Sequence, residues 1–340
     1  MATNKRILII NVNWIGDVLF STPFIRAVRE AYPDSYIACL LHPRCREALE
    51  GNPRLDEIII YDEERLHKGM WSKLALIAAL WKKSFDTTFI LHRSFTKALI
   101  AKLAGTKELV GYPTKKRSFL LTTAVEEPLD QPHKVEYFLN IARAAGIKPK
   151  DVSYEFFVSE ADSRYAGTFL ADNGVKEEDR LVVICPGGNW GPKRWPEENF
   201  AKLADILCNK FSARILISGT DKEAALGGRI KSLMAAEPII ACGHTTLKQL
   251  GSIFKRSSLV IANDTGTMHL AVAMKARVIA LFGPTSPEIT GPYGAGNYKV
   301  IRKANECDIP CYNFSCTDNR CMRAISVRDV QEEAERMFLR

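Results

Sequence analysis

A polar turn after a short apolar run carries the strongest chemical pattern in this sequence. The turn reads NDTGT over residues 263–267, and a small-residue stretch that favours a helix follows it. Free N–H groups at such a helix N-terminus, with the hydroxyls of Thr265 and Thr267, suit a phosphate or pyrophosphate. Gly266 would let the backbone approach that ligand closely. In the alternative interpretation, Asp264 and Thr265 only cap the helix.

A loop rich in glycine and basic residues forms a second candidate site. It reads PGGNWGPKRWP over residues 186–196, directly after an apolar run. Glycines such as Gly188 permit close approach, Asn189 is polar, and Lys193 supplies a point charge for phosphate. The spacing is not that of a Walker A motif, which disfavours ATP hydrolysis. The alternative is a proline-rich loop with solvated charges.

Two carboxylates complete the candidate chemistry. The pair Gly16-Asp17 follows the first predicted strand, at the edge of an α/β sheet where binding or catalytic groups are expected. A lone Asp there could also cap a helix. Only one glycine is present, so the dinucleotide-binding fingerprint is missing, and an NAD(P)-dependent oxidoreductase is disfavoured. Glu223, after a later apolar run, could accept hydrogen bonds from ribose hydroxyls or have a surface or capping role.

The elements that must position these residues alternate between strand and helix patterns. This alternation predicts doubly wound parallel sheets. Predicted strands span 6–12, 36–41, 57–61, 87–91, 181–185, 214–218, 238–241, 258–261 and 277–282, and predicted helices include 70–81, 94–103, 133–145, 269–274 and 326–339.

The pattern predicts two similar Rossmann-like domains that face each other across a cleft. The first would span 1–165 and the second 175–325, with a linker around 155–180. The remaining segment, 326–340, contains an amphipathic helix that we expect to pack back on the N-terminal domain. Residues 112–133 are aperiodic and predict a long loop.

Composition narrows the class of protein. The chain has 340 residues, of which 46% are hydrophobic and 25% charged, as in an ordinary globular protein. No run approaches the roughly 18 apolar residues of a membrane span, and the N-terminus has no signal-peptide pattern, so we expect a cytoplasmic protein. The net charge of +8 favours anionic partners. No common nucleic-acid-binding signature is present, so nucleic acid is not an expected partner.

Nine cysteines need separate treatment. Those in apolar runs, such as Cys185, are predicted core residues. Four others follow the spacing C-x3-C-x4-C-x4-C near the end of the chain, namely Cys307, Cys311, Cys316 and Cys321. A zinc or iron–sulfur site, a disulfide or redox pair, and packed thiols all remain open, because the spacing lacks a C-x2-C pair.

Three segments together resemble glycosyltransferase family 9, the ADP-heptose:lipopolysaccharide heptosyltransferases. They are ILIINVNWIGDVLFSTP, CPGGNWGPKRWPEENFAKLA and VIANDTGTMHLAVAMKARVIALFGPTSP, and they occur in the right order over nearly the whole chain. The cysteine-bearing end is similar to heptosyltransferase II-like members. The resemblance implies a GT-B fold, with the acceptor on the N-terminal domain and the nucleotide sugar on the C-terminal one. It also implies inverting transfer of heptose from ADP-L-glycero-β-D-manno-heptose to the inner core of lipopolysaccharide (Kdo-lipid A), with no metal or other cofactor.

The resemblance assigns roles to individual residues. Asp17, of the pair Gly16-Asp17, would be the general base that deprotonates the acceptor hydroxyl. The donor pyrophosphate would lie on Lys193 and the turn Thr265-Gly266-Thr267. The remaining donor-side residues would be Gly188 and Asn189 in the phosphate loop, Glu223 at the ribose, Asp264 at sugar hydroxyls or the turn, and His269 near the phosphate.

Several alternatives stay open. The basic cluster Lys115-Lys116-Arg117, with Arg93 and Lys97, would face the anionic acceptor and allow peripheral contact with the cytoplasmic face of the inner membrane. It could equally be an ordinary solvated loop. The donor could be another nucleotide sugar and the acceptor another surface glycan. The chain could also be a non-catalytic nucleotide-sugar-binding protein. The acceptor type, I or II, is not decided by the sequence.

Overall fold

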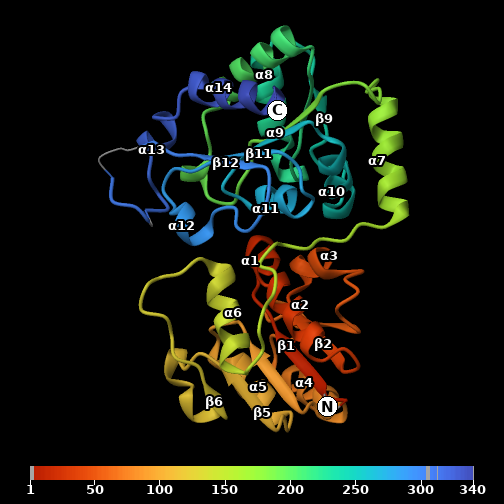
Figure 1. Ribbon diagram of the computed structural model, residues 1–340, viewed down its shortest axis with the longest axis vertical. Coiled ribbons are helices and arrows are strands. Elements are labelled where there is room, and N and C mark those ends of the chain that lie inside the picture. Colours follow the sequence, from red (N-terminus) through yellow and green to blue (C-terminus); the bar gives the residue numbers. More distant parts are fainter. Residues whose placement is uncertain (1–3, 304–306, 312, 340) are drawn as a thin grey trace. The chain divides into compact units, whose positions relative to one another are not determined.

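The computed structural model describes residues 4–303, 307–311 and 313–339, and it divides into two compact units between Phe157 and Val158. Each unit contains one six-stranded parallel sheet flanked by helices (Figure 1). The predicted fold class of two Rossmann-like, doubly wound domains is confirmed.

The sheet of the N-terminal unit has the strand order β3-β2-β1-β4-β5-β6. Its strands are β1 (Arg6–Ile10), β2 (Tyr36–Leu41), β3 (Glu57–Ile60), β4 (Thr87–Ile90), β5 (Glu108–Gly111) and β6 (Thr123–Ala124). Its helices are α1 (Ile15–Phe20), α2 (Thr22–Ala31), α3 (Arg46–Leu49), α4 (Met70–Lys82), α5 (Phe95–Leu103) and α6 (Lys134–Ala144).

Helices bury both faces of this sheet. On one face, Leu8 of β1 shares a core with Leu80 of α4 and Ala101 of α5. On the other face, the ring of Phe24 in α2 lies edge-on to Phe89 in β4, with ring centroids 5.4 Å apart. Strands buried on both faces are apolar along their whole length, which explains why the apolar runs predicted them well.

The C-terminal unit repeats this topology. Its sheet order is β12-β11-β10-β7-β8-β9, which in chain order is the arrangement of the first sheet. Its strands are β7 (Leu181–Cys185), β8 (Arg214–Ile217), β9 (Ile239–Ile240), β10 (Leu259–Asn263), β11 (Val278–Leu281) and β12 (Tyr298–Ile301). Its helices are α7 (Glu160–Asp172), α8 (Glu197–Phe211), α9 (Ala224–Leu233), α10 (Leu247–Arg256), α11 (Gly266–Ala273), α12 (Pro287–Thr290), α13 (Arg320–Arg323) and α14 (Val327–Phe338).

The expected linker around 155–180 is largely helix α7. A capping box formed by Ser159 and Asp162 starts the helix, and Ala166 and Leu170 bury its inner face. Most of its other side chains are solvated, which made the segment resemble a linker in the sequence. The helix belongs to the C-terminal unit and packs beside α10.

The terminal helix α14 packs within the C-terminal unit. Val330 and Ala334 join the core that α8 and the sheet enclose. The indole N–H of Trp195 donates to the carbonyl of Ile325, just before the helix, at 2.8 Å. Its apolar face therefore packs in this unit, and the expected packing on the N-terminal domain stays a prediction.

No helix in the part of the chain that the structure describes is long and apolar enough to cross a membrane.

Candidate active site

The predicted donor residues gather at the carboxyl edge of the second sheet. Strand β10 pairs with β7 in parallel, so the turn 264–267 and the loop 186–196 leave the sheet side by side. The strand order reverses direction at this pair, which is where ligands bind in open α/β sheets.

A buried carboxylate holds the lysine of the loop. Asp264 is only 5% exposed, and its Oδ2 lies 2.6 Å from Nζ of Lys193. The hydroxyl of Thr285, just after β11, donates to the same oxygen at 2.7 Å. Nε2 of His269 is 3.9 Å from Oδ1 of Asp264. Asp264 thus fixes an ammonium group beside the turn.

The turn itself opens helix α11. Thr265 is the residue before the helix, but its side chain makes no capping hydrogen bond. Its hydroxyl instead lies 2.8 Å from that of Thr267. The alternative in which Thr265 caps the helix with its side chain is therefore wrong, and the arrangement matches an anion site built from backbone N–H groups and two hydroxyls.

Glu223 organises the loop from the neighbouring strand. Its Oε1 accepts from the N–H of Gly188 at 2.9 Å, and its Oε2 accepts from the N–H of Thr220 at 2.8 Å. A Cβ at Gly187 would lie 1.9 Å from Oε1, so a larger residue here would push the Glu223 carboxylate aside. Asn189 is exposed on the same loop. These contacts give Glu223 a positioning role besides any contact with ribose.

Asn263 was missed in the sequence. It is fully buried at the end of β10, where its Nδ2 donates to the carbonyl of Pro186 at 2.8 Å. Its Oδ1 accepts from the N–H of Trp195 at 3.1 Å. One amide therefore ties both ends of the loop to the turn, and the available signal was an amide that ends a buried apolar strand.

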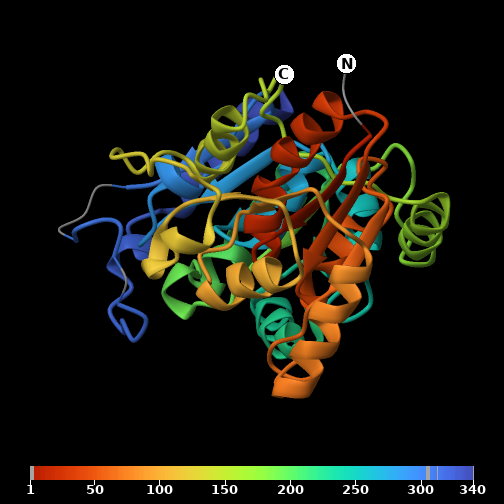
Figure 2. The ribbon, with the colours of Figure 1, turned by 90° about the horizontal axis from the view of Figure 1, so that it is seen from below.

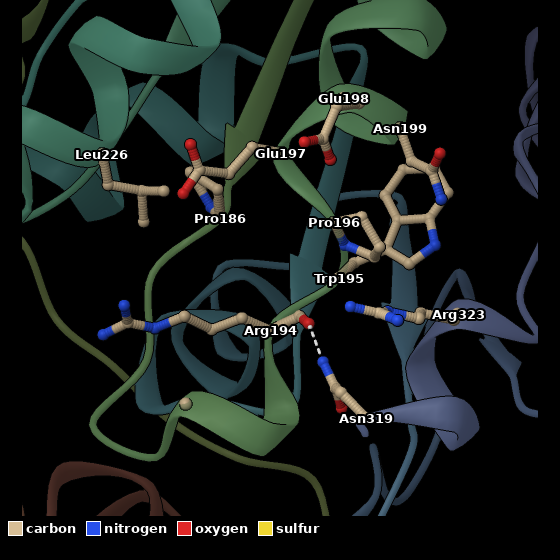
Figure 3. A pocket seen from close by; sticks show the side chains of 11 residues that line it. Pro186, Arg194, Trp195, Pro196, Glu197, Glu198, Asn199, Leu226, Asn319 and Arg323 are labelled. Atoms are coloured by element: carbon tan, nitrogen blue, oxygen red, sulfur yellow. Dashed lines mark hydrogen bonds between the residues drawn. The ribbon is translucent and has the colours of Figure 1, made fainter. Parts of the chain in front are cut away.

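A pocket is formed by this loop together with α8, α9 and the segment that carries α13 (Figure 3). It is lined by Pro186, Gly191, Arg194, Trp195, Pro196, Glu197, Glu198, Asn199, Leu226, Asn319 and Arg323. Nδ2 of Asn319 donates to the carbonyl of Arg194 at 3.0 Å, the bond drawn in the figure. Neither Lys193 nor Asp264 lines this pocket.

The cysteine-bearing segment supports the same edge. The N–H of Cys311 donates to the carbonyl of Pro284 at 2.7 Å, and the rings of Phe314 and Trp190 are 4.7 Å apart. None of these four thiols forms a disulfide; Cys321 is buried and Cys307 is exposed. Burial raises the pKa of the Cys321 thiol. Within the described ranges, no three Cys, His, Asp or Glu side chains are grouped as a metal would require.

Asp17 lies at the corresponding edge of the first sheet. It sits in the first turn of α1 and is partly buried, with Gly16 beside it. The helix begins after Trp14, so Asp17 is not the capping residue. Asn13 in the same loop accepts from Nζ of Lys97 at 2.6 Å and donates to Oε1 of Glu63 at 2.9 Å.

The basic residues predicted for the acceptor side have different environments. Arg117 is fully buried, and its guanidinium donates to the backbone carbonyls of Tyr112 and His92, so it is a structural residue and not part of a solvated loop. Lys115 is exposed. Lys97 is 3% exposed, and burial lowers its pKa to about 8.

Two parallel, doubly wound sheets, each with polar and charged side chains at its carboxyl edge, form a GT-B glycosyltransferase fold. The model of glycosyltransferase family 9 (heptosyltransferase) matches residues 73–320. The chain therefore belongs to glycosyltransferase family 9, the heptosyltransferases.

Individual relatives agree with this assignment. Lipopolysaccharide heptosyltransferase 2 of Salmonella typhimurium is 29% identical over 310 residues, which cover 87% of this chain and 88% of the relative. The solved structure of the E. coli ADP-heptose lipopolysaccharide heptosyltransferase II has a TM-score of 0.80 and 26% identity, with 98% of each chain covered. The family 9 glycosyltransferase of Veillonella parvula has a TM-score of 0.92 and 24% identity, and it covers 100% of this chain and 98% of its own.

Proposed function

We propose that this enzyme transfers heptose from ADP-L-glycero-β-D-manno-heptose to the inner core of lipopolysaccharide, as a type II heptosyltransferase. The observation that carries the proposal is the match to relatives of that name over most of both chains. The arrangement of charged groups at the two sheet edges supports it.

Asp17 is the proposed general base. Its carboxylate takes the proton from an acceptor hydroxyl while the oxygen attacks the anomeric carbon of heptose. The bond from that carbon to the β-phosphate oxygen breaks on the opposite side, so the configuration inverts and ADP leaves. Asp17 lies in the first turn of α1, where the helix N-terminus favours negative charge.

Lys193 and the turn 265–267 are the proposed site for the leaving ADP. The ammonium group is already held in place by Asp264, so it need not be ordered when negative charge develops on the diphosphate. The N–H groups that begin α11 and the two threonine hydroxyls would bind phosphate oxygens. Glu223 would hold the loop in position through the N–H of Gly188 and would contact the ribose.

Lys97 is the proposed contact for the acidic acceptor. Its buried ammonium group donates to the neutral side-chain amide of Asn13, and this amide in turn donates to Glu63. A carboxylate of the acceptor sugar would supply a counter-charge in a poorly solvated place.

The test is turnover with ADP-heptose and two acceptors, Kdo-lipid A with and without one heptose, followed by ADP release and product mass. Transfer only to the heptosylated acceptor supports a type II enzyme. Transfer to the bare acceptor contradicts that assignment and indicates type I. If no ADP is released with either acceptor, while another nucleotide sugar is consumed, the proposed donor is wrong.

A further inference from the structure

Helix α4 is apolar on both sides, although only one side is packed. Apart from Ser72, Lys73 and Lys82, every residue of its sequence, MWSKLALIAALWK, is apolar. Leu76 and Leu80 face the core of the N-terminal unit. A helix that is hydrophobic all round is normally buried on all sides, so the outer side of α4 needs an explanation.

The outer side is a continuous apolar stripe. Trp71, Leu74, Ala75, Ala78 and Trp81 are all exposed and follow the spacing of one helix face. Trp71 is 85% exposed and Trp81 is 64% exposed. Scattered apolar residues are common on protein surfaces, but a contiguous stripe with two tryptophans marks an interaction site. Figures 1 and 2 show α4 at the margin of the N-terminal unit.

The stripe is framed by positive charge. Lys68 precedes the helix, Lys82 ends it, and Lys102 lies at the end of the neighbouring α5; all three are exposed. The helix itself contains no acidic residue. Tryptophans prefer the boundary between the headgroups and the acyl chains of a bilayer, and lysines beside them bind anionic headgroups.

We propose that the outer side of α4 docks on an anionic phospholipid bilayer. With thirteen residues, the helix is too short to span one, and it would lie in the interface with its tryptophans buried among the headgroups. The charges complement this partner, whereas a second copy of this chain, with its net charge of +8, would bring lysines against lysines.

The loop before α4 links this surface to the acceptor edge. Leu66, 70% exposed, and Lys68 lie in the loop that also carries Glu63, the hydrogen-bond partner of Asn13. The link to catalysis rests on the proposed function: a lipid-anchored acceptor would stay in the bilayer while its sugars reach the edge that holds Asp17. Docking through α4 would then bring the enzyme to its acceptor without a membrane span.

The experiment is co-sedimentation of the full chain with vesicles of phosphatidylethanolamine and phosphatidylglycerol that contain no acceptor. We expect Trp71→Gln with Trp81→Gln to weaken binding by roughly tenfold or more, and Lys68→Glu with Lys82→Glu to weaken it several-fold and to reduce its salt dependence. Matched controls are Leu233→Gln and Lys202→Glu, which change an exposed leucine and an exposed lysine of the C-terminal unit and should bind as the wild type does.

Two further readouts separate the explanations. The variants should unfold at the wild-type temperature and should transfer heptose to a delipidated acceptor at the wild-type rate, because the changed side chains are exposed and none is among the residues proposed to bind the donor or the acceptor. Equal sedimentation of wild type and the tryptophan variant would overturn the inference. So would a dimer in sedimentation velocity that the tryptophan variant abolishes. A protein that binds vesicles through α4 but transfers no heptose would leave the inference standing and contradict the proposed function.

Discussion

The two sheets share one topology, yet the lysine at the carboxyl edge of each has a different partner: a carboxylate in one unit and an amide in the other. In the C-terminal unit, Lys193 pairs directly with the buried carboxylate of Asp264. In the N-terminal unit, Lys97 is more deeply buried and donates to the amide of Asn13, which stands between it and Glu63. Lys193 is neutralised by its partner before any ligand arrives, whereas Lys97 keeps a charge that burial disfavours.

The lysines also come from different sides of the switch point. Lys193 follows the first strand of its sheet, β7, whereas Lys97 follows the fourth strand of its own, β4. At the place after β1 that corresponds to Lys193, the N-terminal unit has Asp17. Under the proposed function, the same scaffold presents a base in one copy and a phosphate-binding cation in the other, because loops and not strands carry the chemistry.

Removal of the base should have the largest effect. We expect Asp17→Asn to lower kcat by about 10³-fold, because the amide cannot accept the acceptor proton. Measurement of ADP release should show this loss, while calorimetric titration with ADP should give an unchanged Kd. An active Asp17→Asn enzyme would exclude this residue as the base.

The paired lysine should come next. Lys193→Met should reduce kcat/KM by about 10²-fold through loss of charge at the diphosphate. It should also lower the free energy of unfolding by about 1–3 kcal/mol, because Asp264 keeps a buried charge without its ammonium partner. The matched control is the double variant Lys193→Met with Asp264→Asn, which should regain stability in urea unfolding and remain inactive. Recovery of activity in that double variant would contradict the proposed role.

The unpaired lysine should respond differently. Lys97→Met should leave stability unchanged or raise it, because it removes a buried charge, and it should raise the KM for the acceptor about tenfold. The lowered pKa means that the ammonium form is present below about pH 8 and lost above it. Wild-type kcat/KM for the acceptor should therefore fall as the pH rises through about 8, and the variant should lack this limb. If kcat/KM for the acceptor falls above pH 8 in both proteins alike, Lys97 does not take part in acceptor binding.

Loop support should give the smallest effect. Gly187→Ala would place a methyl group against the Glu223 carboxylate, so the carboxylate must move away from the N–H of Gly188, and we expect donor affinity to fall about fivefold. Gly191→Ala is the matched control, since a Cβ there meets no atom within 4 Å. Fluorescence titration with ADP compares the two. Equal affinities in both variants would show that Glu223 does not set the loop.

Much of this fold could be predicted because its strands are buried on both faces. The run at 181–185 matches β7 residue for residue. The edge strands β6 and β12 were missed, since they are short or partly exposed and lack a continuous apolar run. The sequence of α7 resembles a linker because its buried face is narrow, with Ala166 and Leu170 as its buried residues.

The candidate site was predicted in its residues more than in its contacts. Motif positions indicated Lys193 and Asp264, but not that they pair or that Thr285 joins them. The hydrogen bonds of Glu223 to the loop cross 35 residues of sequence, and those of Asn263 cross 68 or more. The burial of Arg117 and Lys97 likewise depends on packing that no local pattern encodes.

The separate hydrophobic cores of the two units have a thermodynamic consequence. Because each unit has its own core, we expect each to unfold in its own cooperative transition, and a ligand stabilises only the unit to which it binds. If ADP binds to the C-terminal unit as proposed, saturation at 100 times its Kd would add about 2.7 kcal/mol to the stability of that unit. Differential scanning calorimetry should then show two transitions, one whose melting temperature rises with ADP and one whose melting temperature does not change. The two units would thus be distinguished by their thermal unfolding.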